Sequence, residues 1–246
     1  SINWITNVNF LRKMIGILGG MGTRAGLDFC NKLAKLNVGK TDQNYPVFIL
    51  YNKSNIPKRP ENLNRYNYVL KSLVKGCNLL KKNKCKFIVM PCNTAHHWHE
   101  DLQKKIKIPI ISMPKEVYLH TKKTCRKNSK IGILCTEATL KTKVYSKYFD
   151  KEFNLISPSQ SLQIKSVNKA IRLVKTGKVK EAEKAIRPAV NQLIKLNCKK
   201  IILGCTELPI AIFAYKSFQK IKKSKTFIDP NLLLADVSMK RYKKTN

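Results

Sequence analysis

The sequence predicts an α/β protein made of two pseudo-symmetric lobes, each a parallel sheet flanked by helices, with the functional site in the cleft between them. Short runs rich in Ile, Val and Leu alternate with segments whose apolar residues recur at helical spacing. This alternation is typical of parallel sheets covered by helices. The strand runs are apolar at consecutive positions, as expected for sheets buried on both faces. Two segments of the chain also occur twice, which predicts two similar halves.

The expected elements follow from these runs in chain order. We expect strands at Met14–Leu18, Val47–Tyr51, Phe87–Met90, Ile108–Ser112, Ile131–Leu134, Phe153–Ile156, Ile201–Leu203 and Thr226–Ile228. We expect helices at Arg24–Leu36, Leu63–Lys82, Thr142–Tyr148, Gln160–Lys175 and Lys180–Leu196. Met21 and Gly22 form the turn from the first strand into the first helix. With 246 residues the chain is long enough to bury a sizeable core.

Two pairs of matching segments indicate a duplication. Met14–Leu18 and Lys130–Leu134 share the sequence Ile-Gly-Ile-Leu, and Cys85–Cys92 matches Cys198–Cys205 in its first residues, its apolar centre and its last Cys. Both matches stand at nearly the same offset along the chain, as expected when one α/β unit is repeated. Each half therefore opens with a strand that contains glycine and later presents a Cys just after another strand.

The repeat also sets the expected limits of the lobes. These limits are residues 14–112 and 215–246 for lobe 1, 113–214 for lobe 2, and 1–13 for an N-terminal extension. Pro109 and Pro114 mark the first passage of the chain between the lobes, and the stretch from Pro209 to Lys216 marks the second. Lobe 1 then carries Cys92 and lobe 2 carries Cys205.

The net charge of the chain is unusual. Lys and Arg number 49 against 14 Asp and Glu, which gives +35. Such a charge suits a nucleic acid or an anionic membrane, but the basic residues are spread along the whole chain, and most are Lys rather than Arg, the usual reader of bases and phosphates. We interpret them as a solvated surface and expect no nucleic-acid partner. No apolar run approaches the roughly 20 residues of a membrane-spanning helix, so no membrane association is expected.

The eight cysteines are expected to be reduced. None forms a Cys-x-x-Cys pair, and residues 1–13 lack the basic start and apolar core of a secretory signal. A chain of this length does not need disulfides to be stable. We therefore expect a cytoplasmic protein.

A histidine cluster raises the question of a metal. His96, His97 and His99 follow Cys92 closely, but no neighbouring pattern supplies the four ligands of a zinc site. We expect no metal, a hydrogen-bonding role near the site for His96, and positions on the helix surface for His97 and His99.

Cys92 and Cys205 follow apolar runs, where an α/β protein places its ligand site. Ligands bind at the carboxyl ends of parallel strands, and the free N–H groups at the start of the next helix favour a carboxylate or a thiolate. The small polar residues that follow the two cysteines are Asn93, Thr94, Thr206 and Glu207. Two thiols on opposite sides of one cleft suit a stereoinversion, in which one removes a proton and the other returns it from the far side. The alternative is a pair of buried structural cysteines.

With these motifs the chain resembles the aspartate/glutamate racemase superfamily, specifically its aspartate racemase branch, from Met14 to about Val237. The motifs are Gly19–Gly22, Ile56–Arg59, Met90–His96, Thr136–Thr139, Lys175–Gly177, Leu203–Pro209 and Asp229–Pro230. Glutamate racemases usually begin with an Asp-Ser pair and carry His after the second Cys-Thr, whereas this chain has Gly19, Gly20 and Glu207. The resemblance implies a homodimeric racemase that needs no cofactor and interconverts L- and D-aspartate through two cysteine acid/base groups.

The resemblance also implies roles for particular residues. Cys92 and Cys205 are the catalytic pair, and the expected substrate-binding residues are Met21, Arg59, Asn93, Thr94, Thr136, Lys175, Thr206 and Glu207. Asn93 and Thr94 contact a substrate carboxylate, and Arg59 and Lys175 match the basic residues that flank the substrate. The alternatives are surface charges for Arg59 and Lys175.

One departure from the family leaves the substrate open. Lys58 stands where the family usually has Asp before Arg59, so a charge is reversed beside the site. Two alternatives therefore remain beside aspartate racemisation. One is the same chemistry on glutamate or another amino acid, and the other is a basic protein that binds nucleic acid on a racemase scaffold that has lost its activity.

Overall fold

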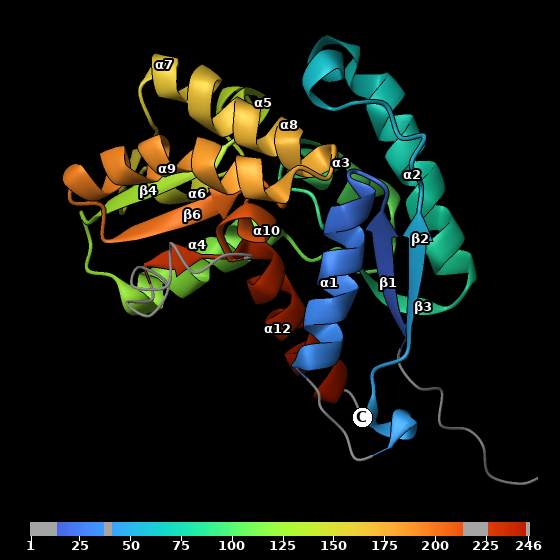
Figure 1. Cartoon of the computed structure of the whole chain (residues 1–246). Coiled ribbons are helices and arrows are strands. Elements are labelled where there is room, and N and C mark those ends of the chain that lie inside the picture. The colour runs from blue at the N-terminus through green and yellow to red at the C-terminus, as the bar shows by residue number, and fades with distance from the viewer. Residues whose placement is uncertain (1–13, 37–40, 214–225, 245–246) are drawn as a thin grey trace, which may run out of the picture.

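The computed structural model describes residues 14–36, 41–213 and 226–244 and has two lobes (Figure 1). The first sheet contains β1 (Met14–Gly19), β2 (Phe48–Asn52) and β3 (Cys85–Val89). The second contains β4 (Lys130–Cys135), β5 (Asn154–Ile156), β6 (Lys200–Gly204) and β7 (Phe227–Ile228). All pairings are parallel, so the predicted α/β fold is confirmed.

The two sheets share one topology. Their strand orders are β2-β1-β3 and β5-β4-β6-β7, so the two segments that contain Ile-Gly-Ile-Leu are the strands β1 and β4. The glycines of these strands serve the same purpose, because each lets a covering helix approach closely. A Cβ on Gly16 would lie 3.2 Å from the Cβ of Leu80, and one on Gly132 would lie 2.9 Å from Leu193 Cδ1. The repeat in the sequence is therefore a repeat in the packing.

Helices cover both faces of the first sheet. They are α1 (Thr23–Lys35), the 3₁₀ turns η1 (Asp42–Asn44), η2 (Pro60–Arg65) and η3 (Thr94–Trp98), α2 (Tyr66–Lys82) and α3 (His99–Lys105). Helix α2 packs on the face that carries Leu18 and Ile88. Helix α1 packs on the opposite face, where Ile15 and Ile17 are fully buried.

The second sheet is covered in the same way. Its helices are α4 (Met113–Thr124), α5 (Glu137–Lys141), α6 (Ser146–Phe149), α7 (Gln160–Leu162), the π-helical turn η4 (Gln163–Asn168), α8 (Lys169–Lys175), α9 (Val179–Lys195) and α10 (Leu208–Phe213). Helices α8, α9 and α10 pack against Leu134 and Leu203. On the other face, residues of α4 and α6 pack against Ile133 and Ile202.

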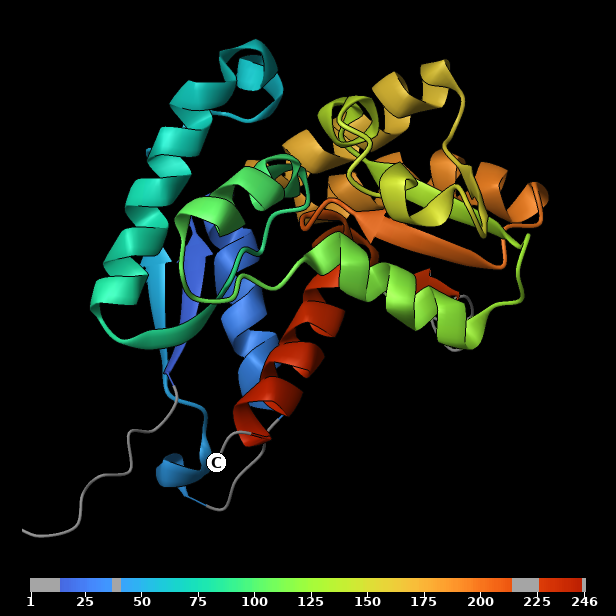
Figure 2. The same ribbon diagram turned by 180° about the vertical axis from the view of Figure 1, so that it is seen from behind.

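The C-terminal part of the chain is divided between the lobes. Strand β7 pairs with β6 in the second sheet, through Phe227 and Ile228, although residues 215–246 were assigned to lobe 1. Helix α12 (Pro230–Lys243) instead lies beside α1 and α4 (Figure 2). Its Leu234 and Met239 pack in the core of the first lobe. We keep the division near residue 113 as a proposal, with β7 counted in lobe 2.

One expected strand is absent. The segment Ile108–Ser112 forms only a single bridge, between Ile88 and Ile110. The pairing does not extend because Pro109 has no N–H to donate on one side of the bridge, and the N–H of Met113 on the other side goes to His96 Nε2. The apolar pattern predicted the burial of this segment, but the prediction that it pairs as a strand was wrong.

Other boundaries also differ from expectation. The helix expected from Thr142 begins only at Ser146. Pro114, interpreted as a boundary between lobes, lies in the first turn of α4, where proline is tolerated. Residues 1–13 and 214–216 lie outside the described residues. Within the described part of the chain, none of the helices has the length and apolar character needed to cross a bilayer.

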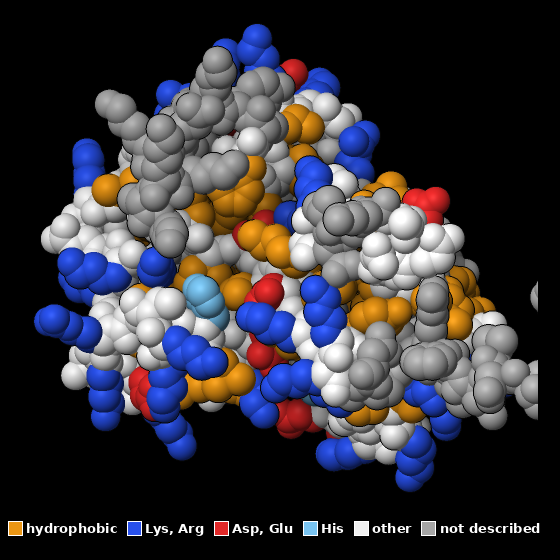
Figure 3. Space-filling model, turned by 90° about the horizontal axis from the view of Figure 1, so that it is seen from below, with side chains coloured by type: hydrophobic (Ala, Val, Ile, Leu, Met, Phe, Trp, Pro, Cys, Tyr) orange, Lys and Arg blue, Asp and Glu red, His pale blue; other side chains and the backbone are white. Residues whose placement is uncertain are grey.

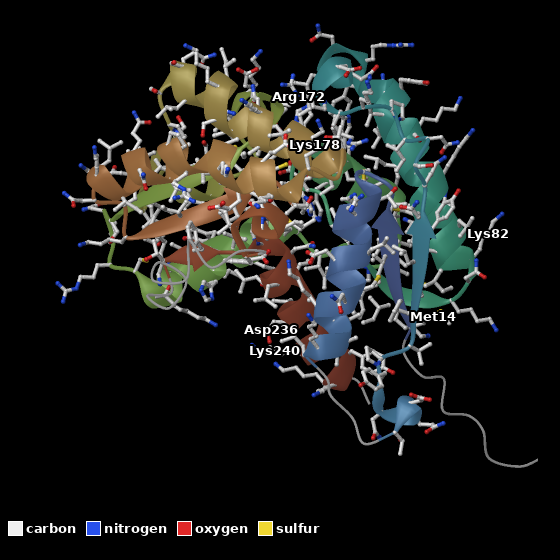
Figure 4. All side chains as sticks on the ribbon, viewed as in Figure 1. Met14, Lys82, Arg172, Lys178, Asp236 and Lys240 are labelled. Atoms are coloured by element: carbon white, nitrogen blue, oxygen red, sulfur yellow. The ribbon has the colours of Figure 1, made fainter. Side chains whose placement is uncertain are left out.

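The basic surface is diffuse. Figure 3 shows Lys and Arg side chains scattered over both halves of the lower face rather than gathered in one patch. Some are paired on their own helix, as Lys240 is with Asp236 on α12 at 2.6 Å (Figure 4). This distribution agrees with the interpretation of the charge as a solvated surface.

Candidate active site

The two cysteines of the repeat line one cavity. Cys92 follows β3 and Cys205 follows β6, at the carboxyl ends of the two sheets, and their side chains are 6% and 7% exposed. The cavity is lined by all ten predicted site residues, Met21, Arg59, Cys92, Asn93, Thr94, Thr136, Lys175, Cys205, Thr206 and Glu207, together with Pro60 and Gly204. The fold thus brings together residues from both lobes that are far apart in the sequence.

This cavity is narrow and opens into a wider one. Its volume of about 30 Å³ holds only a few water molecules, so an amino acid enters only when the surrounding side chains or lobes move apart. The adjoining cavity, of about 500 Å³, shares Arg59, Pro60, Thr136 and Lys175 with it and adds charged residues of both signs. We call this second cavity the mouth. Its Arg172 is labelled in Figure 4 on α8.

The loop that carries Cys92 is fixed by His96. His96 Nδ1 donates to the carbonyl of Cys92 at 2.9 Å, and Nε2 accepts the N–H of Met113 at 3.1 Å. Burial, followed by the charge of His99, lowers the pKa of His96 to about 3, so the ring is neutral. A neutral imidazole suits this arrangement, since one nitrogen must donate and the other must accept. His96 therefore ties the Cys92 loop to the start of α4.

The other two histidines of the cluster are not simple surface groups. His99 donates to the carbonyl of Ile110 at 2.8 Å, and its ring stacks on His96. His97 meets the rings of Tyr66 and Trp98 edge to face. His97 lies in the 3₁₀ turn η3 and His99 is the first residue of α3, and both side chains are half-buried rather than fully on a helix surface. Among the described residues, no group of three acidic, His or Cys side chains is placed to hold a metal ion.

Cys205 is held as a thiol by Glu207. Its Sγ donates to Glu207 Oε2 at 3.0 Å, and Glu207 is 4% exposed. Burial raises the pKa of the Cys205 thiol well above its usual range, and the negative charge and hydrogen bond of Glu207 raise it further, against a smaller opposing effect of Lys175. Cys205 therefore carries its proton at neutral pH.

Gly22 leaves room for the Glu207 carboxylate. A Cβ on Gly22 would lie 2.9 Å from Glu207 Oε1, closer than such atoms ordinarily approach. The glycine therefore admits the carboxylate that contacts the sulfur of Cys205.

Arg59 is a buried cation held by backbone carbonyls. It is 9% exposed, and it donates to the carbonyl of Met21 at 2.6 Å and to that of Pro57 at 3.1 Å. Its Nε is buried without a partner among the described residues. Arg59 is therefore not a surface charge, and it lines the cavity without an ion pair to any carboxylate of the described residues. Lys58, by contrast, is 76% exposed and pairs with Glu61 at 3.1 Å at the mouth.

Three threonine hydroxyls meet across the two lobes. Thr94 Oγ1 lies 2.8 Å from that of Thr139 and 3.2 Å from that of Thr136, and the last two are 3.0 Å apart. Thr136 is the N-cap of α5 and accepts the N–H of Thr139. Thr139 was not among the predicted site residues. The sequence could have indicated it, because Thr139 stands three residues after Thr136, at the position whose N–H an N-cap side chain accepts.

The chain is similar to known proteins of one enzyme family. The family model described as Asp/Glu/Hydantoin racemase matches residues 18–237. The broad specificity amino-acid racemase RacX of Bacillus subtilis is 25% identical over 233 residues, which cover 93% of this chain and 98% of RacX. A glutamate racemase of Carboxydothermus hydrogenoformans is 28% identical over 157 residues, which cover 61% of this chain and 54% of that protein.

Solved structures share the fold. The aspartate racemase of Picrophilus torridus superposes with a TM-score of 0.80 at 28% identity, and the match covers 94% of each chain. An aspartate racemase homologue of Pyrococcus horikoshii has a TM-score of 0.75 at 21% identity, over 95% of this chain and 100% of that one. The glutamate racemase of Thermus thermophilus has a TM-score of 0.68 at 20% identity, over 95% and 82% of the two chains.

Proposed function

The chain belongs to the Asp/Glu/hydantoin racemase family and is an amino-acid racemase, and on that premise we propose that it interconverts L- and D-aspartate by proton transfer between two cysteines, without a cofactor. The observation that carries the proposal is one cavity that holds the buried thiols of Cys92 and Cys205 beside the unneutralised cation of Arg59. Two proton-transfer groups and a site for a carboxylate are what this reaction requires.

The two cysteines have different starting states in the proposed mechanism. Burial and the Glu207 carboxylate keep Cys205 protonated, so Cys92 acts first as the base. The Cys92 thiolate takes the α-proton and becomes a thiol, which leaves a planar carbanion. The Cys205 thiol then gives its proton to the opposite face and becomes a thiolate. The reverse reaction, or proton exchange with solvent, restores the starting state.

The carbanion needs fixed donors because the α-proton is far less acidic than any thiol. Donors already in place cost no reorganisation at the moment of reaction. Arg59 provides a guanidinium, which recognises carboxylates through two parallel hydrogen bonds. Lys175 adds a second positive charge, and Asn93 and Thr94 add neutral donors beside Cys92. These groups would hold the two carboxylates of aspartate.

The choice of aspartate is supported by the likeness to an aspartate racemase at 28% identity over 94% of each chain. Lys58 lies at the mouth with its charge paired to Glu61, so it does not face the reacting atoms. The alternative is a different or wider substrate range. It is supported by the likeness to RacX and to glutamate racemases.

Two further properties belong to this proposal. We propose that the racemase is a homodimer, on the resemblance of its motifs to the aspartate racemase branch. We also propose that it acts in the cytoplasm, because its eight cysteines are all free, as expected where thiols stay reduced.

The deciding experiment follows the α-proton in deuterated water under reducing conditions. L-aspartate, L-glutamate and other L-amino acids are incubated separately with the protein, and NMR and chiral chromatography detect deuterium uptake and the D-enantiomer. Racemisation of aspartate supports the proposal, whereas preference for another amino acid keeps the chemistry and replaces the substrate. No exchange with any of them overturns the proposed function.

Matched cysteine variants test the two-base mechanism. Cys92→Ser and Cys205→Ser should each abolish racemisation. Cys125→Ser, which lines neither cavity, should leave it unchanged. Racemisation at a near-normal rate in either of the first two would overturn the assignment of the two bases.

A further inference from the structure

Tyr145 reaches from the core of the second lobe to the catalytic loop of the first. It directly precedes α6, after a turn in which Lys143 adopts a left-handed backbone with φ 52°. Its ring packs beside Phe149, and the side chain is 1% exposed. Its hydroxyl donates a short hydrogen bond to Asn93 Oδ1, although the two residues are 52 positions apart. This contact joins the two lobes beside Cys92.

The other end of the Asn93 amide has no partner. Asn93 lines the catalytic cavity and is 2% exposed, and its buried Nδ2 makes no hydrogen bond to the described residues. Leaving a buried donor unpaired costs about 1–3 kcal/mol, and native structures contain few such groups. A substrate carboxylate is the group that would satisfy this NH₂.

The hydroxyl of Tyr145 decides which way the amide faces. Burial raises the pKa of Tyr145 well above its usual range, so the phenol keeps its proton. Among the described residues, Asn93 Oδ1 is the acceptor of that proton. If the amide were turned over, the O–H would lose its acceptor, and Oδ1 would face the cavity, where it would repel a carboxylate. The observed orientation avoids both costs.

We propose that Tyr145 is a positioning residue of the racemase: its hydroxyl holds the Asn93 amide with the NH₂ toward the cavity, as a donor to a substrate carboxylate. This inference rests on the proposed function. Tyr145 does not touch the substrate in this scheme and acts only through Asn93. It also makes the donor depend on the closed arrangement of the lobes, because the phenol and the amide come from different lobes.

The test is a double-mutant cycle on the full chain, with Tyr145→Phe, Asn93→Ala and the two combined. The matched control is Tyr148→Phe, the same change on α6, where the hydroxyl lies 3.5 Å from Ser112 Oγ. We measure kcat and KM for aspartate. We also measure the affinity for succinate, which has both carboxylates but no amino group and does not react. Thermal unfolding reports whether each variant folds.

Tyr145→Phe should lower kcat/KM and the affinity for succinate by about tenfold to a hundredfold, the usual effect of losing a hydrogen bond to a charged group. Tyr148→Phe should leave both unchanged. In the Asn93→Ala background, Tyr145→Phe should cause no further loss, because the group that it positions is absent.

Three results would overturn the inference. The first is that Tyr145→Phe and Tyr148→Phe change kcat/KM and succinate affinity equally. The second is that Tyr145→Phe lowers kcat/KM as much in the Asn93→Ala background as in the wild type. The third is that Tyr145→Phe lowers the unfolding temperature but leaves kcat/KM and succinate affinity unchanged. A wild-type protein that racemises no amino acid but binds succinate with the predicted pattern would overturn the proposed function and leave the inference standing. If the wild type neither racemises nor binds, both are wrong.

Discussion

Removing the charge of Glu207 should increase the fraction of Cys205 that is present as the reactive thiolate. Glu207→Gln is the suitable change because Gln keeps an oxygen acceptor and the size of the side chain that fits against Gly22. The carboxylate oxygen lies 3.0 Å from the sulfur. Two unit charges at that distance repel by about 5 kcal/mol at an effective dielectric constant of about 20.

That repulsion sets an upper limit on the effect. About 1.4 kcal/mol corresponds to a factor of ten, so the full 5 kcal/mol would change the thiolate population by more than a thousandfold. The opposing charge of Lys175 and water at the mouth reduce the effect. We therefore expect Glu207→Gln to speed alkylation of Cys205 by about tenfold or more at neutral pH.

The assay measures alkylation by iodoacetamide across a range of pH, with the modified cysteine identified by mass spectrometry. It is carried out in a Cys92→Ala background so that only one thiol in the cavity reacts. Glu61→Gln, at the mouth and 64% exposed, is the control for a general change in charge and should not alter the profile. An unchanged profile in Glu207→Gln would refute the idea that the carboxylate holds the proton on Cys205.

The remaining predictions concern Gly22, His96 and the two thiols. Gly22→Ala should displace the Glu207 carboxylate, since the new Cβ would lie 2.9 Å from it; kcat should fall at least tenfold, and a normal kcat would show that Glu207 has room to move. The unfolded chain binds a proton on His96 near pH 6.5, whereas the folded chain does so only near 3. The free energy of unfolding should therefore decrease as the pH falls from about 6.5 to about 3, by up to about 1.4 kcal/mol per pH unit from this group. His96→Gln should reduce that slope in urea unfolding, and an equal slope in both proteins would contradict it. Finally, Cys205→Ala should still exchange the α-proton of one enantiomer with deuterated water, whereas Cys92→Ala should exchange neither; the opposite pattern would reverse the roles of the two cysteines.

Most of the strands and the two cysteines that follow them were predicted correctly in position because local patterns in the sequence determine them. Strands such as Met14–Gly19 and Lys130–Cys135 are apolar at consecutive positions, and the repeated glycines within them reflect the same helix contact. The site residues Cys92 and Cys205 were found because they stand directly after such strands. The predicted residues at this cleft do line one cavity, although their roles remain proposals.

What the sequence did not reveal depends on contacts between distant segments. The N–H of Met113, which would extend the pairing of Ile108–Ser112, is taken by His96, so an apolar run did not become a strand. Gly22 matters because of Glu207, which lies in the other half of the chain. Tyr145 carries no motif of its own, and its hydroxyl gains a function only when the two lobes bring it to Asn93. Neither the periodicity of the sequence nor the spacing of its motifs predicts such a contact between the lobes.

The two cysteines stand at equivalent positions of the repeated fold, but different residues contact their loops, and this difference supports the unequal roles proposed for them. A two-base racemase needs one protonated and one deprotonated group at the start of each turnover, yet identical halves would give both cysteines the same proton affinity. The loop after Cys92 is fixed through its backbone by the neutral ring of His96. The loop after Cys205 carries Glu207, whose carboxylate contacts the sulfur itself. The fold supplies the symmetry that places two sulfurs on one cavity, and these two residues break the symmetry that would leave them equivalent.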